Sequence, residues 1–137
     1  MNILFMCVAN SARSQLAEGL ARLILPNDEI QSAGSRPSKL NPYAVTVMQE
    51  IGIDISQYSS KSVDALSPNF IKNLDFVITL CAEEVCPALI SKAKKLHWPL
   101  PDPAIKDNST EAEVLMRFRM TRDVIKEKLE RFAERRI

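Results

Sequence analysis

Residues 2–24, NILFMCVANSARSQLAEGLARLI, carry the pattern that decides the fold. The apolar run from Asn2 to Val8 favours a buried parallel strand, and it stops at a short polar segment around Asn10. Apolar residues then recur at helical spacing as far as Pro26, namely Leu16, Leu20, Leu23 and Ile24. A strand, a short loop and a helix in this order form the opening unit of an α/β fold.

The rest of the chain repeats this alternation. Further strands are predicted at residues 30–33, at 74–80 (LDFVITL) and, as a short edge strand, at 97–98; further helices are predicted at 41–51 and 110–135. With right-handed crossovers, these elements predict a small parallel sheet of about four strands, flanked by helices on both faces. We expect a single domain over residues 1–137, because the sequence contains no repeat and no linker.

The composition is that of an ordinary globular protein. Of the 137 residues, 46% are hydrophobic and 26% are charged, and 18 basic against 17 acidic residues give a net charge of +1. This balance does not favour nucleic acid or an anionic membrane as a partner. The first residues lack the basic region and cleavage site of a signal peptide, so we expect a cytoplasmic protein. No apolar surface stripe is evident, and we expect a monomer.

The sequence contains few residues suited to bind a metal ion or an organic cofactor. His97 is the single histidine, and three cysteines at scattered spacing make a poor zinc site. No Gly-x-Gly-x-x-Gly motif occurs, and the chain has only three glycines. We therefore expect neither a metal site nor a bound cofactor.

The segment from Cys7 to Ser14, CVANSARS, is typical of an anion-binding loop. Successive backbone N–H groups before a helix can converge on one anion, and the planar Arg13 guanidinium matches two oxygens of a tetrahedral oxyanion. The same positive field favours the nucleophilic thiolate of Cys7. The alternative is that Cys7 packs at the end of a strand and Arg13 lies at the surface. The predicted oxyanion-binding residues are Val8, Ala9, Asn10, Ser11, Ala12, Arg13 and Ser14.

At this loop the chain resembles a known family, the low-molecular-weight protein tyrosine phosphatases and the arsenate reductases that share their fold. The resemblance covers nearly the whole chain through a series of short motifs: Ser14, Ala17-Glu18, Ser32-Ala33-Gly34, Asn41-Pro42, Gly52-Ile53-Asp54-Ile55-Ser56 and Asp102-Pro103. An aspartate between prolines is by itself typical of a turn. The resemblance implies that Asp102 is the general acid that protonates a departing oxygen.

Two further cysteines, Cys81 and Cys86, indicate whether the reaction is a hydrolysis or a reduction. They follow the predicted strand 74–80 as Cys-Ala-Glu-Glu-Val-Cys, at the sheet edge where Cys7 is expected. A phosphatase resolves its phosphocysteine with water, whereas a reductase needs two electrons, which thiols can supply. In the relay that we expect, Cys7 attacks arsenate, Cys81 attacks Cys7 and expels arsenite, and Cys86 then attacks Cys81.

The resemblance extends to the thioredoxin-coupled arsenate reductases. It lies in Val-Ile-Thr-Leu-Cys81, Lys95-Leu-His97-Trp98 and Pro101-Asp102-Pro103-Ala104, and it implies thioredoxin as the reductant. Two features of the phosphatase branch are missing, because Gln15 replaces a proline after Ser14 and Ala104 replaces an aromatic residue. A hydrolytic phosphatase, a redox-sensing or binding module without turnover, and a different thiol donor remain as alternatives.

The sequence departs from its relatives at two places. The spacing Cys-x4-Cys between Cys81 and Cys86 is shorter than in some relatives. Some relatives hold a potassium ion behind the anion loop, with ligands that match Asn10, Glu18, Ser32 and an aspartate. Lys61 stands at the aspartate position here, and we expect its ammonium group to replace that ion.

Overall fold

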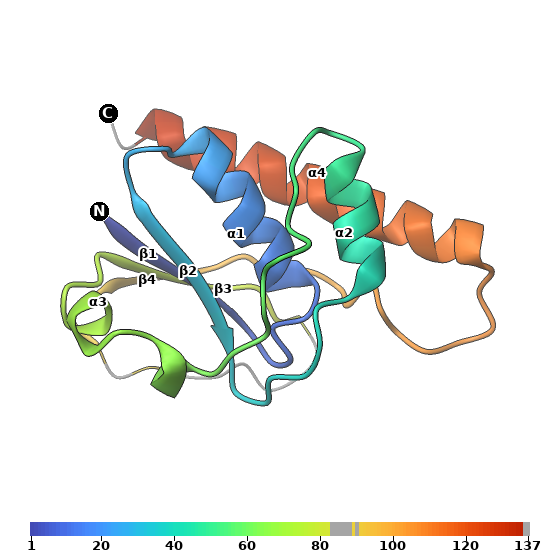
Figure 1. The fold of residues 1–137 in the computed structure, drawn as a ribbon. Coiled ribbons are helices and arrows are strands. Elements are labelled where there is room, and N and C mark those ends of the chain that lie inside the picture. The colour runs from blue at the N-terminus through green and yellow to red at the C-terminus, as the bar shows by residue number, and fades with distance from the viewer. Residues whose placement is uncertain (83–88, 90, 136–137) are drawn as a thin grey trace.

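The computed structural model describes residues 1–82, 89 and 91–135. Within this part of the chain, four strands form one parallel sheet in the order β2-β1-β3-β4, which confirms the predicted sheet (Figure 1). The strands are β1 (Asn2–Cys7), β2 (Glu29–Gly34), β3 (Phe76–Thr79) and β4 (Lys94–His97). The central strand β1 is therefore paired on both sides, and β4 lies at the edge as predicted.

Helices cover both faces of this sheet. One face packs against α1 (Arg13–Ile24), α2 (Pro42–Gln49) and α4 (Glu111–Arg135), which lie together in Figure 1. The other face packs against the 3-10 turn η1 (Val63–Ala65) and the short helix α3 (Pro68–Lys72) through a second apolar cluster that contains Leu66 and Phe70. The two layers bury both sides of β1 and β3, as parallel strands require.

The sequence patterns miss part of this architecture. Neither η1 nor α3 was predicted, because three and five residues are too few to show a helical period. The apolar stripe predicted for α1 is wrong at Leu23, which is 63% exposed. The first turns of α1 are buried on every side, whereas its last turn extends beyond the core.

A charged contact joins α2 to α4. The Glu50 carboxylate, at the end of α2, accepts hydrogen bonds from Arg119 at 2.8 Å and from Arg122 at 3.0 Å. The Arg119 hydrogen bond is the main cause that lowers the pKa of Glu50 below its ordinary value. Arg122 also donates to the Val47 carbonyl at 2.7 Å, which anchors α4 to α2. None of the helices described is both long and apolar enough to cross a membrane.

The end of β2 approaches the loop that follows β1. Gly34 closes β2, and its N–H donates to the Lys61 carbonyl at 2.9 Å. A Cβ at this position would lie 2.4 Å from the Val8 carbonyl oxygen and 2.9 Å from the Asn10 nitrogen. Both atoms belong to the backbone and cannot rotate away, so the loop requires glycine here.

We predict that Gly34→Ala lowers the free energy of unfolding by about 2–4 kcal/mol, because the added methyl group overpacks rigid backbone. Gly52→Ala is the matched control. Gly52 has a φ of 79° but open space around its Cβ position, so only about 1 kcal/mol of backbone strain is expected. Urea denaturation of both variants checks the difference. Equal losses in the two variants would contradict the close approach.

Candidate active site

Cys7 lies at the carboxyl end of the central strand and carries the candidate nucleophile. It is the last residue of β1 and a free thiol that is only 2% exposed. Its sulfur lies 2.9 Å from the hydroxyl oxygen of Ser14, in the first turn of α1. A hydroxyl at this distance can donate a hydrogen bond to a thiolate. A neighbouring hydroxyl and a helix N-terminus both favour a reactive cysteine.

The carbonyl oxygens of the following loop are bound from outside. Those of Val8, Ala9 and Ser11 all accept hydrogen bonds from residues beyond the loop. The donors are the N–H groups of Arg36 (2.9 Å), Ser38 (3.1 Å) and Asn41 (2.9 Å) and the hydroxyl of Ser60 (2.7 Å). Since each peptide unit carries its N–H opposite its carbonyl, this arrangement leaves the N–H groups facing the centre of the loop.

The N–H groups of the loop have the complementary pattern. For residues 8–12, no described part of the chain provides a hydrogen-bond acceptor to the backbone N–H groups. The loop also ends at the N-terminus of α1, where Ala12 gives the helix no side-chain cap. Unpaired N–H groups in a short loop before a helix form a binding site for an anion. The predicted oxyanion-binding residues are thus brought together in one loop.

Asn10 adopts the one strained conformation of this loop. Its φ of 48° is the single positive φ of a non-glycine residue in the described part of the chain, a conformation that asparagine tolerates. The Asn10 amide donates to the hydroxyls of Ser14 at 2.7 Å and Ser32 at 3.0 Å. Its Oδ1 accepts from the Lys61 N–H at 3.0 Å. Asn10 therefore connects the hydroxyl beside Cys7 to β2 and to the segment around Lys61.

Gln15 is a residue of this site that the sequence did not reveal. Its side chain is fully buried, and its Nε2 lies 3.0 Å from the Asn10 carbonyl, 3.1 Å from Asn10 Oδ1 and 3.1 Å from the Ser59 carbonyl. Gln15 thus holds Asn10 in its left-handed conformation. From the sequence we noted only that it replaces a proline, because no local pattern pairs it with Asn10 or Ser59.

Behind the loop, Glu18 is a buried carboxylate with three partners. Its side chain accepts a hydrogen bond from the Ser32 hydroxyl at 2.6 Å and pairs with Arg22 at 2.8 Å and with Lys61 Nζ at 3.6 Å. The Lys61 ammonium therefore lies beside the buried carboxylate behind the loop. With that ammonium and the Arg22 guanidinium already on Glu18, these residues do not fit a bound potassium ion.

Arg13 joins the loop to the far side of the site. It is 5% exposed, and its Nη1 donates to the Leu100 carbonyl at 2.8 Å. The Leu100 N–H in turn donates to the Leu80 carbonyl at 3.1 Å, and the Leu80 N–H donates to the Met6 carbonyl at 3.0 Å. These bonds align the loop after β1, the end of β3 and the segment after β4 along one edge.

Asp102 lies two residues beyond Leu100 and is half-buried. Its Oδ1 accepts from the Ala104 N–H at 2.9 Å, in a turn of the kind expected for an aspartate between prolines. Within the described residues it makes no hydrogen bond to Cys7 or Arg13. The fold therefore brings Asp102 to the edge that holds the anion loop, with one carboxylate oxygen used by its own turn.

Cys81 follows β3 at the same edge of the sheet. It comes directly after Leu80, is 1% exposed and is disulfide-bonded, whereas Cys7 is a free thiol. No Cys7–Cys81 bond is therefore present in this structure. The third predicted cysteine, Cys86, lies outside the described residues. Over the described part of the chain, no group of three His, Cys, Asp or Glu side chains is placed to hold a metal ion.

Known proteins resemble this chain over almost its whole length. Residues 2–136 match the family model described as low molecular weight phosphotyrosine protein phosphatase. Several curated relatives carry the name arsenate reductase. The one from Bacillus licheniformis is 44% identical over 96% of this chain and 94% of its own length. The one from Staphylococcus aureus is 43% identical over 97% of this chain and 96% of its own length.

Solved structures share the fold. The crystal structure of an arsenate reductase from Archaeoglobus fulgidus superposes with a TM-score of 0.79 at 23% identity, over 96% of this chain and 98% of that one. A structure described as an arsenate reductase in the phosphate binding state gives 0.76 at 30% identity, over 97% and 96% of the two chains. With a family model that spans residues 2–136, the chain belongs to the low molecular weight phosphotyrosine protein phosphatase family.

Proposed function

We propose that this chain is an arsenate reductase that converts arsenate to arsenite through Cys7, Cys81 and Cys86. The observation that carries the proposal is the buried free thiol of Cys7 beside a loop whose N–H groups have no acceptor among the described residues. Arsenate is a tetrahedral oxyanion and suits such a loop. Relatives at 42–44% identity over almost the whole chain are named arsenate reductases. In this proposal residues 1–137 form a single catalytic domain.

In the first step, the Cys7 thiolate attacks arsenic. The N–H groups of residues 8–13 and the Arg13 guanidinium hold the arsenate oxygens, and Ser14 stabilises the thiolate before attack. A sulfur–arsenic bond forms and an arsenic–oxygen bond breaks. Asp102 gives a proton to the departing oxygen, which leaves as water. Asp102 lies two residues beyond Leu100, whose carbonyl accepts a hydrogen bond from Arg13, and this position supports the role.

In the second step, the Cys81 thiolate attacks the Cys7 sulfur. A Cys7–Cys81 disulfide forms, the sulfur–arsenic bond breaks, and its electron pair stays on arsenic, which leaves as arsenite. Cys86 then attacks Cys81, and Cys7 returns as a thiolate. An external thiol reductant then reduces the final disulfide, and the resemblance implies that this reductant is thioredoxin. We also propose that the protein is a cytoplasmic monomer.

Hydrolysis of a phosphoester is the second candidate function. The family model supports it, because the phosphatases of this family and the arsenate reductases share the anion loop. A phosphatase would form a phosphocysteine at Cys7 and release it to water, without Cys81 or Cys86. Ala104, beside the candidate acid, supplies no aromatic side chain for a phosphotyrosine ring, which favours reduction.

We predict that Cys7→Ser and Cys81→Ser each lower arsenite release by at least about 100-fold, because each removes a sulfur that the relay requires. The assay follows arsenite and NADPH consumption with thioredoxin and thioredoxin reductase. Slow hydrolysis of 4-nitrophenyl phosphate serves as the internal control. It should disappear in Cys7→Ser and persist in Cys81→Ser. The proposed reductase activity would be refuted if Cys81→Ser released arsenite at the wild-type rate. It would also be refuted if the wild type released no arsenite.

We also propose that Lys61 takes the place of the potassium ion found in some relatives. Its ammonium reaches Glu18 at 3.6 Å, and its N–H binds Asn10 at 3.0 Å, so one residue supports both the charge and the loop. The Lys61 side chain is 20% exposed and the Glu18 side chain 3%, which leaves this pair only partly screened by water.

The wild-type rate is therefore predicted to change less than about twofold when potassium replaces sodium, because the cation position is already filled. Lys61→Gln should lower the free energy of unfolding by about 1–3 kcal/mol, since Glu18 loses a partner. Lys72→Gln, at an exposed residue of α3, is the control and should leave stability unchanged. Chemical denaturation and rates in matched salts measure both effects. A severalfold gain of the wild-type rate in potassium would contradict this assignment.

A further inference from the structure

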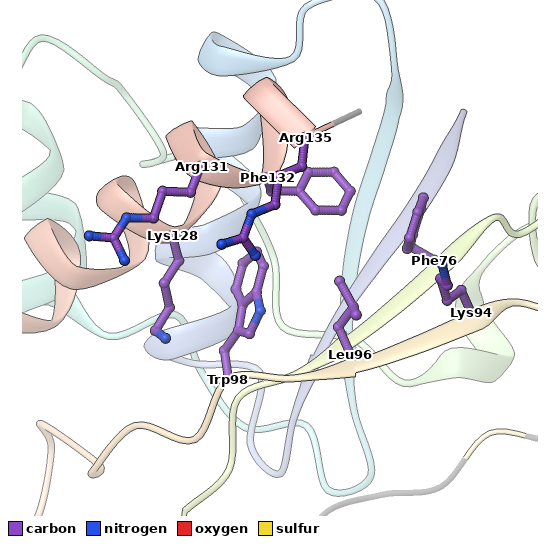
Figure 2. A pocket seen from close by; sticks show the side chains of 8 residues that line it. All are labelled: Phe76, Lys94, Leu96, Trp98, Lys128, Arg131, Phe132 and Arg135. Atoms are coloured by element: carbon purple, nitrogen blue, oxygen red, sulfur yellow. The ribbon is translucent and has the colours of Figure 1, made fainter. Parts of the chain in front are cut away.

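A cavity of about 360 Å³ lies between the edge strand β4 and the last turns of α4 (Figure 2). Phe76 and Lys94, which begin β3 and β4, line it, whereas Cys7 ends β1. Because all strands run parallel, the cavity extends toward the amino edge of the sheet, away from the anion loop. It contains none of the residues assigned to the active site, and its size is within the usual range for small-molecule sites, about 300–1,000 Å³.

The floor of this cavity is apolar and largely aromatic. It consists of Phe76, Leu96, Trp98 and Phe132. The Phe132 ring packs edge-on against Phe76, with centroids 5.0 Å apart, and against Trp98 at 6.2 Å. Trp98 is supported from below by Phe5 in the central strand, at 6.3 Å. These contacts fix the floor in place before any ligand binds, which lowers the entropic cost of binding.

The rim of the cavity is cationic. Lys94 rises from β4, and the other three charges come from one face of α4 (Figure 2). They lie at helical spacing of three and four residues, at Lys128, Arg131 and Arg135. Four positive charges therefore surround an aromatic floor in a chain whose net charge is only +1.

Carboxylates compensate little of this charge. Arg131 pairs with Glu127 at 2.6 Å, but both side chains are more than 60% exposed, so water weakens that pair. Across the described residues, no carboxylate lies within ion-pair distance of Lys94, Lys128 or Arg135. A ligand that brings negative charge to the rim would relieve the repulsion among these cations.

We propose that this cavity is a binding site for an organic anion that joins a flat apolar body to two or more negative charges, the chemistry of a nucleotide. The apolar body packs on Trp98 and Phe132, where ring contacts and apolar burial stabilise it. The phosphate or carboxylate groups lie at the rim and accept charge-assisted hydrogen bonds from Arg135, Lys128 and Lys94. Both parts of the ligand contribute, because the apolar floor offers no partner to a negative charge and the rim cations bind phosphate or carboxylate more strongly than a ring.

The test uses ATP as the probe and Trp98 as the reporter, since it is the single tryptophan of the chain. Inorganic phosphate is present at saturating concentration, so that the anion loop near Cys7 is occupied. We expect a saturable change of Trp98 fluorescence, with the same affinity by calorimetry. Adenosine, which lacks the charges, and tripolyphosphate, which lacks the ring, should each bind at least about tenfold more weakly.

Charge reversal at the rim gives the matched comparison. Lys128→Glu/Arg135→Glu should weaken ATP binding by at least about tenfold. The control Lys72→Glu/Lys126→Glu makes the same change in net charge at exposed residues outside the cavity, and it should bind ATP within about twofold of the wild type. Circular dichroism and thermal midpoints establish that both variants are folded.

Several outcomes would overturn the proposal. If neither fluorescence nor calorimetry detects saturable binding of ATP, the cavity is not a binding site and its rim is only a solvated cationic surface. If ATP binding is weakened equally in the two double variants, the effect is one of net charge and not of this cavity. If phosphate displaces ATP, the ATP site is the anion loop. Tripolyphosphate that binds as tightly as ATP would remove any role for the aromatic floor, and binding of an acidic peptide in place of ATP would assign the cavity to a protein partner.

Discussion

The peptide units of the loop after β1 are held in one orientation by the chain around them. Hydrogen bonds from Arg36, Ser38, Asn41 and Ser60 bind the loop carbonyls from outside, and Gln15 binds the carbonyl of Asn10. The N–H groups are then left for an anion, and the arrangement exists before any anion arrives. Such preorganisation makes electrostatic stabilisation effective, since no dipole has to reorient during the reaction. Gly34 permits this close packing, because any side chain there would collide with the loop.

A continuous network of buried polar groups connects this loop to the core. It runs from the Cys7 sulfur through Ser14, Asn10 and Ser32 to the carboxylate of Glu18. Lys61 and Arg22 balance the Glu18 charge from two sides. Buried polar groups are costly unless each has a partner, so the network also fixes the rotamers of its members. In the mechanism that we propose, this rigidity holds the Ser14 hydroxyl beside the nucleophile while arsenate binds.

The sequence alone could predict the local parts of this account. A strand, the loop from Cys7 to Ser14 and a helix are contiguous, so residue types and spacing were enough to place them. The same is not true of contacts between distant segments. Nothing near Gln15 indicates its bonds to Asn10 and Ser59, and nothing near Leu100 indicates that its carbonyl binds Arg13, 87 residues away. Helical periodicity also predicted, wrongly, that Leu23 is buried, because periodicity cannot show where a helix extends beyond the core.

The proposed relay requires two sulfurs, one in the anion loop and one just after β3, to meet during turnover. Disulfide mapping of Cys86→Ser after treatment with arsenate, without any reductant, measures whether the two sulfurs react with each other. We expect one Cys7–Cys81 disulfide for each arsenite released, because the reaction has to stop before the last exchange. A Cys7 thiol that can still be alkylated after arsenite has been released would contradict it.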